Sequence, residues 1–232
     1  MTVPCDNTGV SLPAKACREL DEAGFTLIPG PVPSHNLARL AASYDEALSN
    51  AVADDIKVGS STTRVRDFVN RGPEFDALYL HPPVLMACHR ILNQNFRLST
   101  MHARTLRPGM PAQNLHVDYE RDPQGWTMVG FIFMVDDFTE NNGATRFIPG
   151  SHLCANAEAY PGEVACGQAG TMIVFNGSVW HGHTANRTSH PRRSMQGAYI
   201  RRDAGSGEDL RVRMLPETLS RLSPLAKCVL AI

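Results

Sequence analysis

Two residues suited to binding a metal, His116 and Asp118, lie two positions apart and shortly before a strongly apolar run at 127–135. Alternate residues of a β-strand point to the same face, so an imidazole nitrogen and a carboxylate oxygen can reach one point from one short segment. Two histidines and one carboxylate form the facial triad of non-haem Fe(II) oxygenases, so the pair needs one further histidine. A His-x-Asp pair alone would ordinarily be part of an exposed strand edge, and the rest of the sequence decides between these interpretations.

The third ligand is expected from a later strand, and the run 179–184 offers two candidates. His181 and His183 again share one strand face, and either could complete the triad. The ordinary role of a single histidine is a hydrogen bond in the core or in a loop. His102 is a weaker candidate, and His152, which follows a Pro-Gly-Ser turn, is better explained as a loop histidine.

Composition narrows the class of protein. The chain has 232 residues and a formal net charge of -1, which gives no reason to expect nucleic acid or an anionic membrane as a partner. No run approaches the roughly 18 apolar residues that span a bilayer, and no signal peptide is visible at the start of the chain. The six cysteines, at 5, 17, 88, 154, 166 and 228, show no C-x-x-C spacing. They indicate free thiols in a reducing compartment, so we expect a cytosolic protein.

Helical patterns are concentrated in the first third of the chain. We expect helices at about 12–23, 34–52, 74–80 and 83–92. The second has the clearest apolar spacing, with Ser34 as its expected N-cap. A short strand is expected at 25–28, and a loop over 54–72, where the sequence is polar. Residues 1–12 are expected to form a loose leader.

From residue 96 onward, short β-type runs recur between Gly, Pro and Asn residues. They occupy 96–106, 115–118, 127–135, 144–148, 171–175, 179–184 and 194–201. This spacing favours an all-β barrel or sandwich. No linker or repeat divides the chain, so we expect a single domain over residues 1–232. It would comprise a helical buttress at about 12–93, a β core at about 96–201, and a C-terminal segment at 202–232 with an amphipathic piece at 216–229.

Several motifs together form a longer pattern. His116-Val-Asp118 is followed by a segment at 136–152 that contains Asn-Gly-Ala-Thr-Arg and Pro-Gly-Ser-His, then by Trp-His-Gly at 180–182 and Pro-Arg-Arg at 191–193. This pattern, which covers roughly residues 20 to 201, resembles the phytanoyl-CoA dioxygenase family of Fe(II)- and 2-oxoglutarate-dependent oxygenases. The resemblance implies a mainly β fold, the double-stranded β-helix or jelly roll of cupin-like proteins, buttressed by N-terminal helices.

The resemblance also implies roles for individual residues. In the family the second metal-binding histidine precedes the 2-oxoglutarate arginine by eleven residues, which selects His181 as the ligand and Arg192 as the anchor, with His183 and Arg193 as the alternative pair. A planar arginine fork suits a terminal carboxylate. Two further positions match co-substrate contacts of the family, Gln113 and Thr145, for which ordinary turn or strand-edge hydrogen bonding is the alternative.

As the resemblance implies, the reaction would use Fe(II), O2 and 2-oxoglutarate, release succinate and CO2, and hydroxylate, desaturate or cyclise a small metabolite or natural-product intermediate. The residues expected near the mouth of the site are Arg64, Arg66, Tyr119 and Trp126. Two other classes remain open. One is a cupin-type metalloenzyme that does not use 2-oxoglutarate and has no need of Arg192. The other is a non-catalytic binding protein on a dioxygenase fold, which metal content would test.

Overall fold

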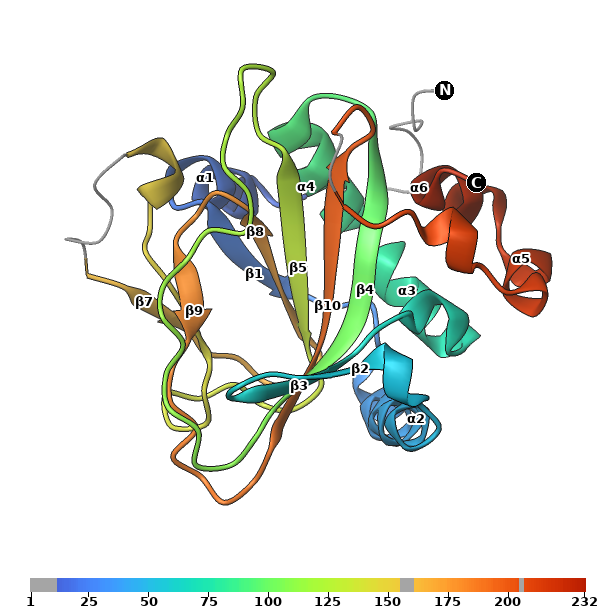
Figure 1. Ribbon diagram of the computed structural model, residues 1–232. Coiled ribbons are helices and arrows are strands. Elements are labelled where there is room, and N and C mark those ends of the chain that lie inside the picture. The colour runs from blue at the N-terminus through green and yellow to red at the C-terminus, as the bar shows by residue number, and fades with distance from the viewer. Residues whose placement is uncertain (1–11, 155–160, 205–206) are drawn as a thin grey trace.

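Two antiparallel β-sheets form the centre of the molecule (Figure 1). The computed structural model describes residues 12–154, 161–204 and 207–232. The expected leader at 1–12, except for its last residue, and Cys5 lie outside these ranges. The mainly β, jelly-roll fold expected from the sequence is confirmed.

The larger sheet has seven strands in the order β1-β8-β5-β10-β4-β3-β2, and every neighbouring pair is antiparallel. Its strands are β1 (Phe25–Pro29), β2 (Ile56–Val58), β3 (Thr62–Val65), β4 (Phe96–Leu106), β5 (Met128–Met134), β8 (Thr171–Asn176) and β10 (Arg192–Arg201). The long strands β4 and β10 pair from Leu106 with Arg192 to Phe96 with Arg201. Alternate residues of these two strands therefore project over one face of the sheet along its whole length.

The smaller sheet has the order β7-β6-β9, with β6 (Thr145–Phe147), β7 (Glu163–Ala165) and β9 (His181–His183). An isolated bridge between His116 and His181 places the segment that carries His116 beside β9. The residues of β6 and β9 that project from this sheet share a cavity with β4 and β10 of the larger sheet. The two sheets thus face each other across that cavity.

Strand β5 is apolar throughout because both of its faces are buried. Val129, Phe131 and Phe133 belong to one apolar cluster, whereas Ile132 and Met134 belong to another. The first cluster lies between the larger sheet and the helices, and the second lies between the two sheets. An unbroken apolar run is the pattern expected of a strand covered on both sides.

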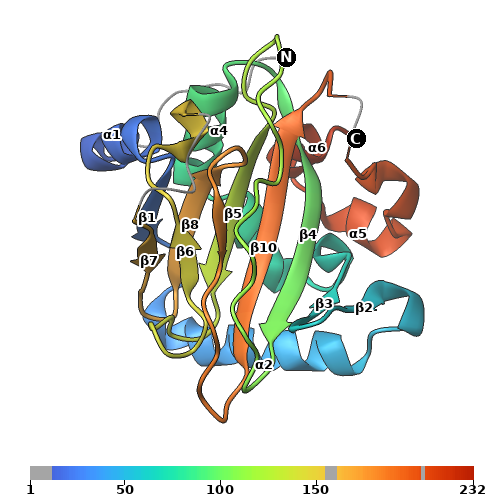
Figure 2. The same cartoon turned by 60° about the vertical axis from the view of Figure 1, so that its left-hand side comes forward.

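Helices cover the outer face of the larger sheet, away from β6 and β9 (Figures 1 and 2). They are α1 (Ala14–Glu22), α2 (Leu37–Ser49), α3 (Asp76–Tyr79), α4 (Pro82–Leu92), α5 (Pro216–Arg221) and α6 (Pro224–Leu230). No helix in these described ranges is long and apolar enough to cross a membrane. Because the helices share an apolar cluster with the larger sheet, they support the sheet from its outer face.

Several local expectations are wrong. The expected loop at 54–72 contains β2 and β3, so the β part of the chain is not confined to 96–201. Strand β2 has only three residues, all exposed, and lies at the sheet edge, so its apolar residues do not form the buried alternation over several positions that identifies a strand. Strand β7 was not expected at all, and 115–118 forms a single bridge rather than a strand.

Helix boundaries differ for identifiable reasons. Ser34 makes no capping hydrogen bond, because residues 34–36 form a 3-10 turn that precedes α2. The expected amphipathic piece at 216–229 forms two helices, because Pro224 begins a new one with Ser223 as its cap. Proline is favoured at the first position of a helix, where its missing N–H costs nothing.

Candidate metal centre

Backbone pairing brings His116 and Asp118 beside β9. The amide of His116 donates to the carbonyl of His181 at 3.0 Å, and the amide of His181 donates to that of His116 at 2.9 Å. The amide of Asp118 donates to the carbonyl of Gly177 at 2.9 Å. These hydrogen bonds fix two side chains from one segment next to a third from β9, although the segment is not a regular strand.

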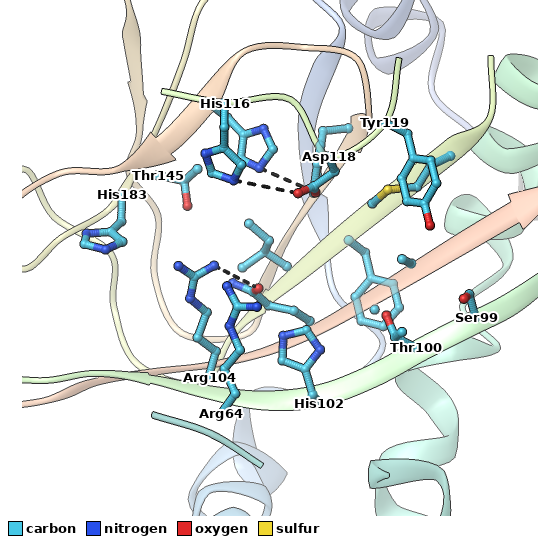
Figure 3. Close-up of a pocket in the computed structure, with 18 of the residues that line it drawn as sticks. Arg64, Ser99, Thr100, His102, Arg104, His116, Asp118, Tyr119, Thr145 and His183 are labelled. Carbon is cyan, nitrogen blue, oxygen red and sulfur yellow. Dashed lines mark hydrogen bonds and ion pairs between the residues drawn. The ribbon is translucent and has the colours of Figure 1, made fainter. Parts of the chain in front are cut away.

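The side chains of His116, Asp118 and His181 converge on one point (Figure 3). One ligand atom from each residue lies within 4.8 Å of the other two. The Nε2 atom of His116 is 3.7 Å from Oδ1 of Asp118, and the Nε2 atom of His181 is 3.6 Å from Oδ2. Two imidazole nitrogens and a carboxylate oxygen form a donor set that suits a divalent transition metal such as Fe(II).

The two imidazoles are oriented by backbone carbonyls. Nδ1 of His116 lies 3.1 Å from the carbonyl oxygen of Asn114, and Nδ1 of His181 lies 3.0 Å from that of Val179. A carbonyl only accepts, so Nδ1 carries the proton in both rings and Nε2 presents a lone pair to the common point. Such hydrogen bonds to the second nitrogen are the usual support of a metal-binding histidine.

His181 is the buried member of the three, with 7% of its surface exposed. Its ring lies 4.9 Å from that of Phe175 and 5.6 Å from that of Phe147, measured between centroids. Burial lowers the pKa of His181, while the nearby Asp118 carboxylate raises it. The ring is therefore held neutral near pH 7, the form that binds a metal.

The neighbouring His183 has both ring nitrogens engaged elsewhere. Nδ1 donates to the carbonyl of Thr184 at 2.8 Å, so Nε2 accepts from the hydroxyl of Ser61 at 3.0 Å. Burial lowers the pKa of His183 to about 4. Its ligand atoms are not part of the converging group. The geometry therefore favours His181 over His183 as the metal-binding residue of β9.

The two less favoured histidines lie elsewhere. His102 projects from β4 on the opposite wall of the cavity (Figure 3), and burial lowers its pKa to about 3. His152 packs against Trp126, with ring centroids 5.6 Å apart. Neither joins the converging group.

A close backbone approach next to β9 requires a glycine. A Cβ atom added to Gly182 would lie 3.1 Å from the backbone oxygens of both Gln113 and Asn114. The absence of a side chain thus lets the segment that carries His116 lie against β9. This close approach helps to bring Asp118 next to His181.

The converging group opens into a cavity of about 370 Å³ between the two sheets. Most of the residues that the sequence selected line it: His116, Asp118, His181, Arg192, Gln113, Thr145, Arg64 and Tyr119. Arg66 and Trp126 do not. Arg66 ion-pairs with Asp55 at 3.3 Å, and Trp126 lies under the guanidinium of Arg121 and against His152. Neither side chain therefore lines this cavity.

Arg192 and Arg193 occupy opposite faces of β10. Arg192 is 2% exposed, donates to the carbonyl of Gly143 at 3.0 Å and lies 4.1 Å from the ring centroid of Phe138. Among the described residues it forms no ion pair with a carboxylate, and its Nε atom is buried without a partner. Burial lowers the pKa of Arg192 to about 10, so the side chain stays charged at pH 7.

Arg193 is already neutralised by the protein. Its guanidinium lies 2.7 Å from Asp136 and 2.7 Å from Asp45 on the outer side of the sheet. Of the two arginines, only Arg192 presents an uncompensated charge inside the cavity.

Sequence reasoning missed two polar residues of the cavity, Arg104 and Gln196. Arg104 shares a face of β4 with His102, and Gln196 lies opposite His102 on β10. The alternation of side chains along 96–106 could have placed Arg104 beside His102. The pairing of β4 with β10, which brings Gln196 there, is not visible in the sequence.

Comparison with known proteins gives a consistent result. The family model of phytanoyl-CoA dioxygenase matches residues 20–194. The dioxygenase trt7 of Aspergillus terreus is 31% identical over 209 residues, which cover 79% of this chain and 71% of that protein. The multifunctional dioxygenase prhA of Penicillium brasilianum is 29% identical and covers 78% of this chain and 70% of that protein.

Solved structures share the fold at lower identity. The non-heme alpha ketoglutarate dependent carbocyclase SnoK from nogalamycin biosynthesis has a TM-score of 0.72 at 20% identity, covering 92% of each chain. EctD from S. alaskensis with bound Fe has a TM-score of 0.71 at 16% identity, covering 84% of this chain and 79% of that one. At these identities the likeness shows the same fold.

Proposed function

The chain belongs to the phytanoyl-CoA dioxygenase family, and from this premise we propose that it is a non-haem Fe(II)- and 2-oxoglutarate-dependent oxygenase whose metal is held by His116, Asp118 and His181. One observation carries the proposal. Two imidazole Nε2 atoms and the Asp118 carboxylate face one point, and both imidazoles are tethered through Nδ1 in the orientation that a metal requires. The donor set is that of the facial triad.

When bound, Fe(II) and 2-oxoglutarate together supply the oxidising chemistry: O2 is consumed, 2-oxoglutarate is converted to succinate and CO2, and a C–H bond of the substrate is oxidised. Asp118 contributes the negative charge that a divalent cation needs. His181 and the aromatic rings around it form the apolar wall that limits water on one side of the site.

Arg192 would hold the far carboxylate of 2-oxoglutarate. Its charge is buried and unpaired within the described residues, and an isolated buried charge is costly unless a ligand compensates it. Thr145 and Gln113 line the same cavity and would add neutral hydrogen bonds to the co-substrate. The contact of Arg192 with Phe138 and with the carbonyl of Gly143 positions the guanidinium before the co-substrate arrives.

The substrate would be a small metabolite or natural-product intermediate, and the outcome a hydroxylation, desaturation or cyclisation. Support comes from the size of the cavity, about 370 Å³, which suits a small molecule together with the co-substrate. Similar proteins include a multifunctional dioxygenase, a carbocyclase and an epimerase, so proteins of this fold carry out several oxidative reactions.

We also propose that residues 1–232 act as one domain in a reducing, cytosolic compartment. One apolar cluster includes Leu20 of the helical part, Phe131 of the β core and Val229 of the C-terminal segment, which supports common folding of the described residues. Five cysteines of the described residues are free thiols, as is usual in a reducing compartment.

The test is succinate formation by purified protein. We expect succinate only when Fe(II) and 2-oxoglutarate are both present, at a slow rate even without substrate, and none in Asp118→Ala. Metal content and 2-oxoglutarate binding by calorimetry provide readouts independent of turnover. Oxidation of a substrate at full rate without 2-oxoglutarate would favour the cupin-type alternative. A protein that binds no divalent metal would favour a non-catalytic role.

A further inference from the structure

Arg104 projects from β4 into the cavity, on the wall opposite His116 and Asp118 (Figure 3). Its Nη2 donates to the amide oxygen of Gln113 at 3.0 Å, and its Nη1 makes a long contact of 3.4 Å with that of Gln196. Both partners are neutral. Nε of Arg104 has no partner among the described residues.

Two other arginines with little exposed side-chain surface are paired differently. Arg71 ion-pairs with Asp55 at 2.7 Å, and Arg201 ion-pairs with Asp122 at 2.5 Å. In both cases a carboxylate of the protein itself balances the charge of the arginine. No carboxylate of the described residues ion-pairs with Arg104. Its compensating anion is therefore expected from outside the chain.

Arg104 remains charged under ordinary conditions. Burial lowers its pKa to about 9, the nearby Arg64 and Arg192 lower it further through like-charge repulsion, and the Asp118 carboxylate raises it. A pKa of about 9 leaves the guanidinium protonated at pH 7. Arg64 and Arg192 lie close enough to repel Arg104, and an anion bound between these guanidinium groups would relieve the repulsion.

Charge in the cavity does not balance with the co-substrate alone. Its described lining holds three arginines, Arg64, Arg104 and Arg192, against two carboxylates, Asp118 and Glu208. A divalent metal adds two positive charges, and 2-oxoglutarate adds two negative ones. One positive charge is then left over. A single further anionic group would make the occupied cavity neutral.

One wall of the same cavity is apolar. Met128, Ile132 and Ile200 line it, from β5 and β10, with Tyr119 nearby. A ligand that fills the cavity beyond the co-substrate therefore meets an apolar surface and a cationic one. An amphiphilic molecule with one charged end fits both.

Resting on the proposed function, we infer that the substrate is a small carboxylic acid with an apolar body, and that Arg104 binds its carboxylate and so orients the body toward the metal centre. A planar guanidinium is well suited to a carboxylate. Arg104 donates a hydrogen bond to Gln113, which is a proposed contact of 2-oxoglutarate. This hydrogen bond would link the substrate-binding residue to the co-substrate site. Arg104 thereby acts as a specificity-determining residue.

The test is calorimetric titration of the protein loaded with Mn(II) and saturating 2-oxoglutarate. The probes are cyclohexanecarboxylate, 4-phenylbutyrate and decanoate, each compared with its primary amide, which has the same body without the charge. We expect at least one acid to bind tenfold or more tightly than its amide. Arg104→Gln should abolish that preference, and Arg104→Lys should retain part of it.

Controls separate this inference from the proposed function. Arg66→Gln changes an arginine that is bound to Asp55 outside the cavity, and it should keep the full preference for acids. Metal-dependent binding of 2-oxoglutarate is measured first in the same protein, and its absence would refute the proposed function instead. The inference is overturned if no acid is preferred over its amide, or if the preference survives in Arg104→Gln. It is also overturned if Arg104→Gln weakens 2-oxoglutarate as much as Arg192→Gln does, since Arg104 would then serve the co-substrate.

Discussion

Replacement of Arg192 by alanine should weaken 2-oxoglutarate binding much more than it slows the chemical step. The guanidinium is 2% exposed and is held in place by Gly143 and Phe138 whether or not a ligand is present. Loss of one partner of a buried, hydrogen-bonded charge pair costs about 2–5 kcal/mol, because the other charge is left desolvated. At about 1.4 kcal/mol per tenfold change, the KM for 2-oxoglutarate should rise by more than an order of magnitude.

The chemical step should change little, since the far carboxylate is bound equally well before and during the reaction. Such uniform binding affects KM rather than kcat. Arg192→Lys should recover part of the affinity, because an ammonium replaces the fork imperfectly. The matched control is Arg193→Ala, which truncates the next side chain of β10 and breaks its ion pairs with Asp136 and Asp45 outside the cavity.

The assay is a 2-oxoglutarate titration of succinate formation at saturating Fe(II), supported by calorimetry with Mn(II). An unchanged KM in Arg192→Ala, together with a large rise in Arg193→Ala, would show that Arg192 does not bind the far carboxylate of 2-oxoglutarate. It would show that the eleven-residue spacing selects the wrong arginine, and it would reopen His183 as a ligand.

Three further outcomes are expected. His181→Ala should lose divalent metal in a metal-content assay, whereas His183→Ala should keep it, since both ring nitrogens of His183 are engaged by Ser61 and Thr184. The reverse result would identify His183 as the metal-binding residue. His102 has a pKa of about 3 in the folded protein, below the ordinary value of 6.5. As the pH drops from 6.5 toward 3, His102 therefore becomes protonated in the unfolded chain but not in the folded protein. The free energy of unfolding falls over this pH range as a result. That fall is at most about 1.4 kcal/mol per pH unit, and urea denaturation of His102→Gln should show a flatter dependence than the parent protein; an equal slope would assign the effect to other groups. Gly197→Ala should destabilise the fold by about 1–3 kcal/mol in the same assay, because its Cβ would lie 2.2 Å from the ring of Phe131; unchanged stability would mean that the ring moves aside freely.

Strands with strong apolar alternation or continuous apolar character were predictable from the sequence. The run 96–106 coincides with β4, and 127–135 contains β5, because each strand is long and well buried. Edge strands were not predictable in this way. The residues of β2 are exposed on both faces, so the polar sequence at 54–72 was indistinguishable from a loop.

The metal-binding candidates were predictable because they depend on short spacings. His116 and Asp118 converge even though 115–118 is not a regular strand, since backbone pairing with β9 and Gly177 fixes their orientation. The choice between His181 and His183 was open in the sequence without the family spacing. It depends on the hydroxyl of Ser61, which is 122 positions from His183 in the chain.

The substrate side of the cavity depends on contacts between distant segments. Arg104 becomes significant only when β4 and β10 pair and place it beside Gln196 and opposite Asp118. Contacts with distant residues also explain why Arg66 and Trp126 do not line the cavity. Asp55 holds Arg66 away from the cavity, and Arg121 and His152 hold Trp126.

The most direct test of the central claim is a crystal structure of the protein soaked with Mn(II) and 2-oxoglutarate. We expect one metal ion bound by Nε2 of His116, Nε2 of His181 and the carboxylate of Asp118. We also expect that the far carboxylate of 2-oxoglutarate lies against Arg192. A metal held by His183, or a co-substrate whose far carboxylate rests on Arg193 or Arg104, would contradict the central claim.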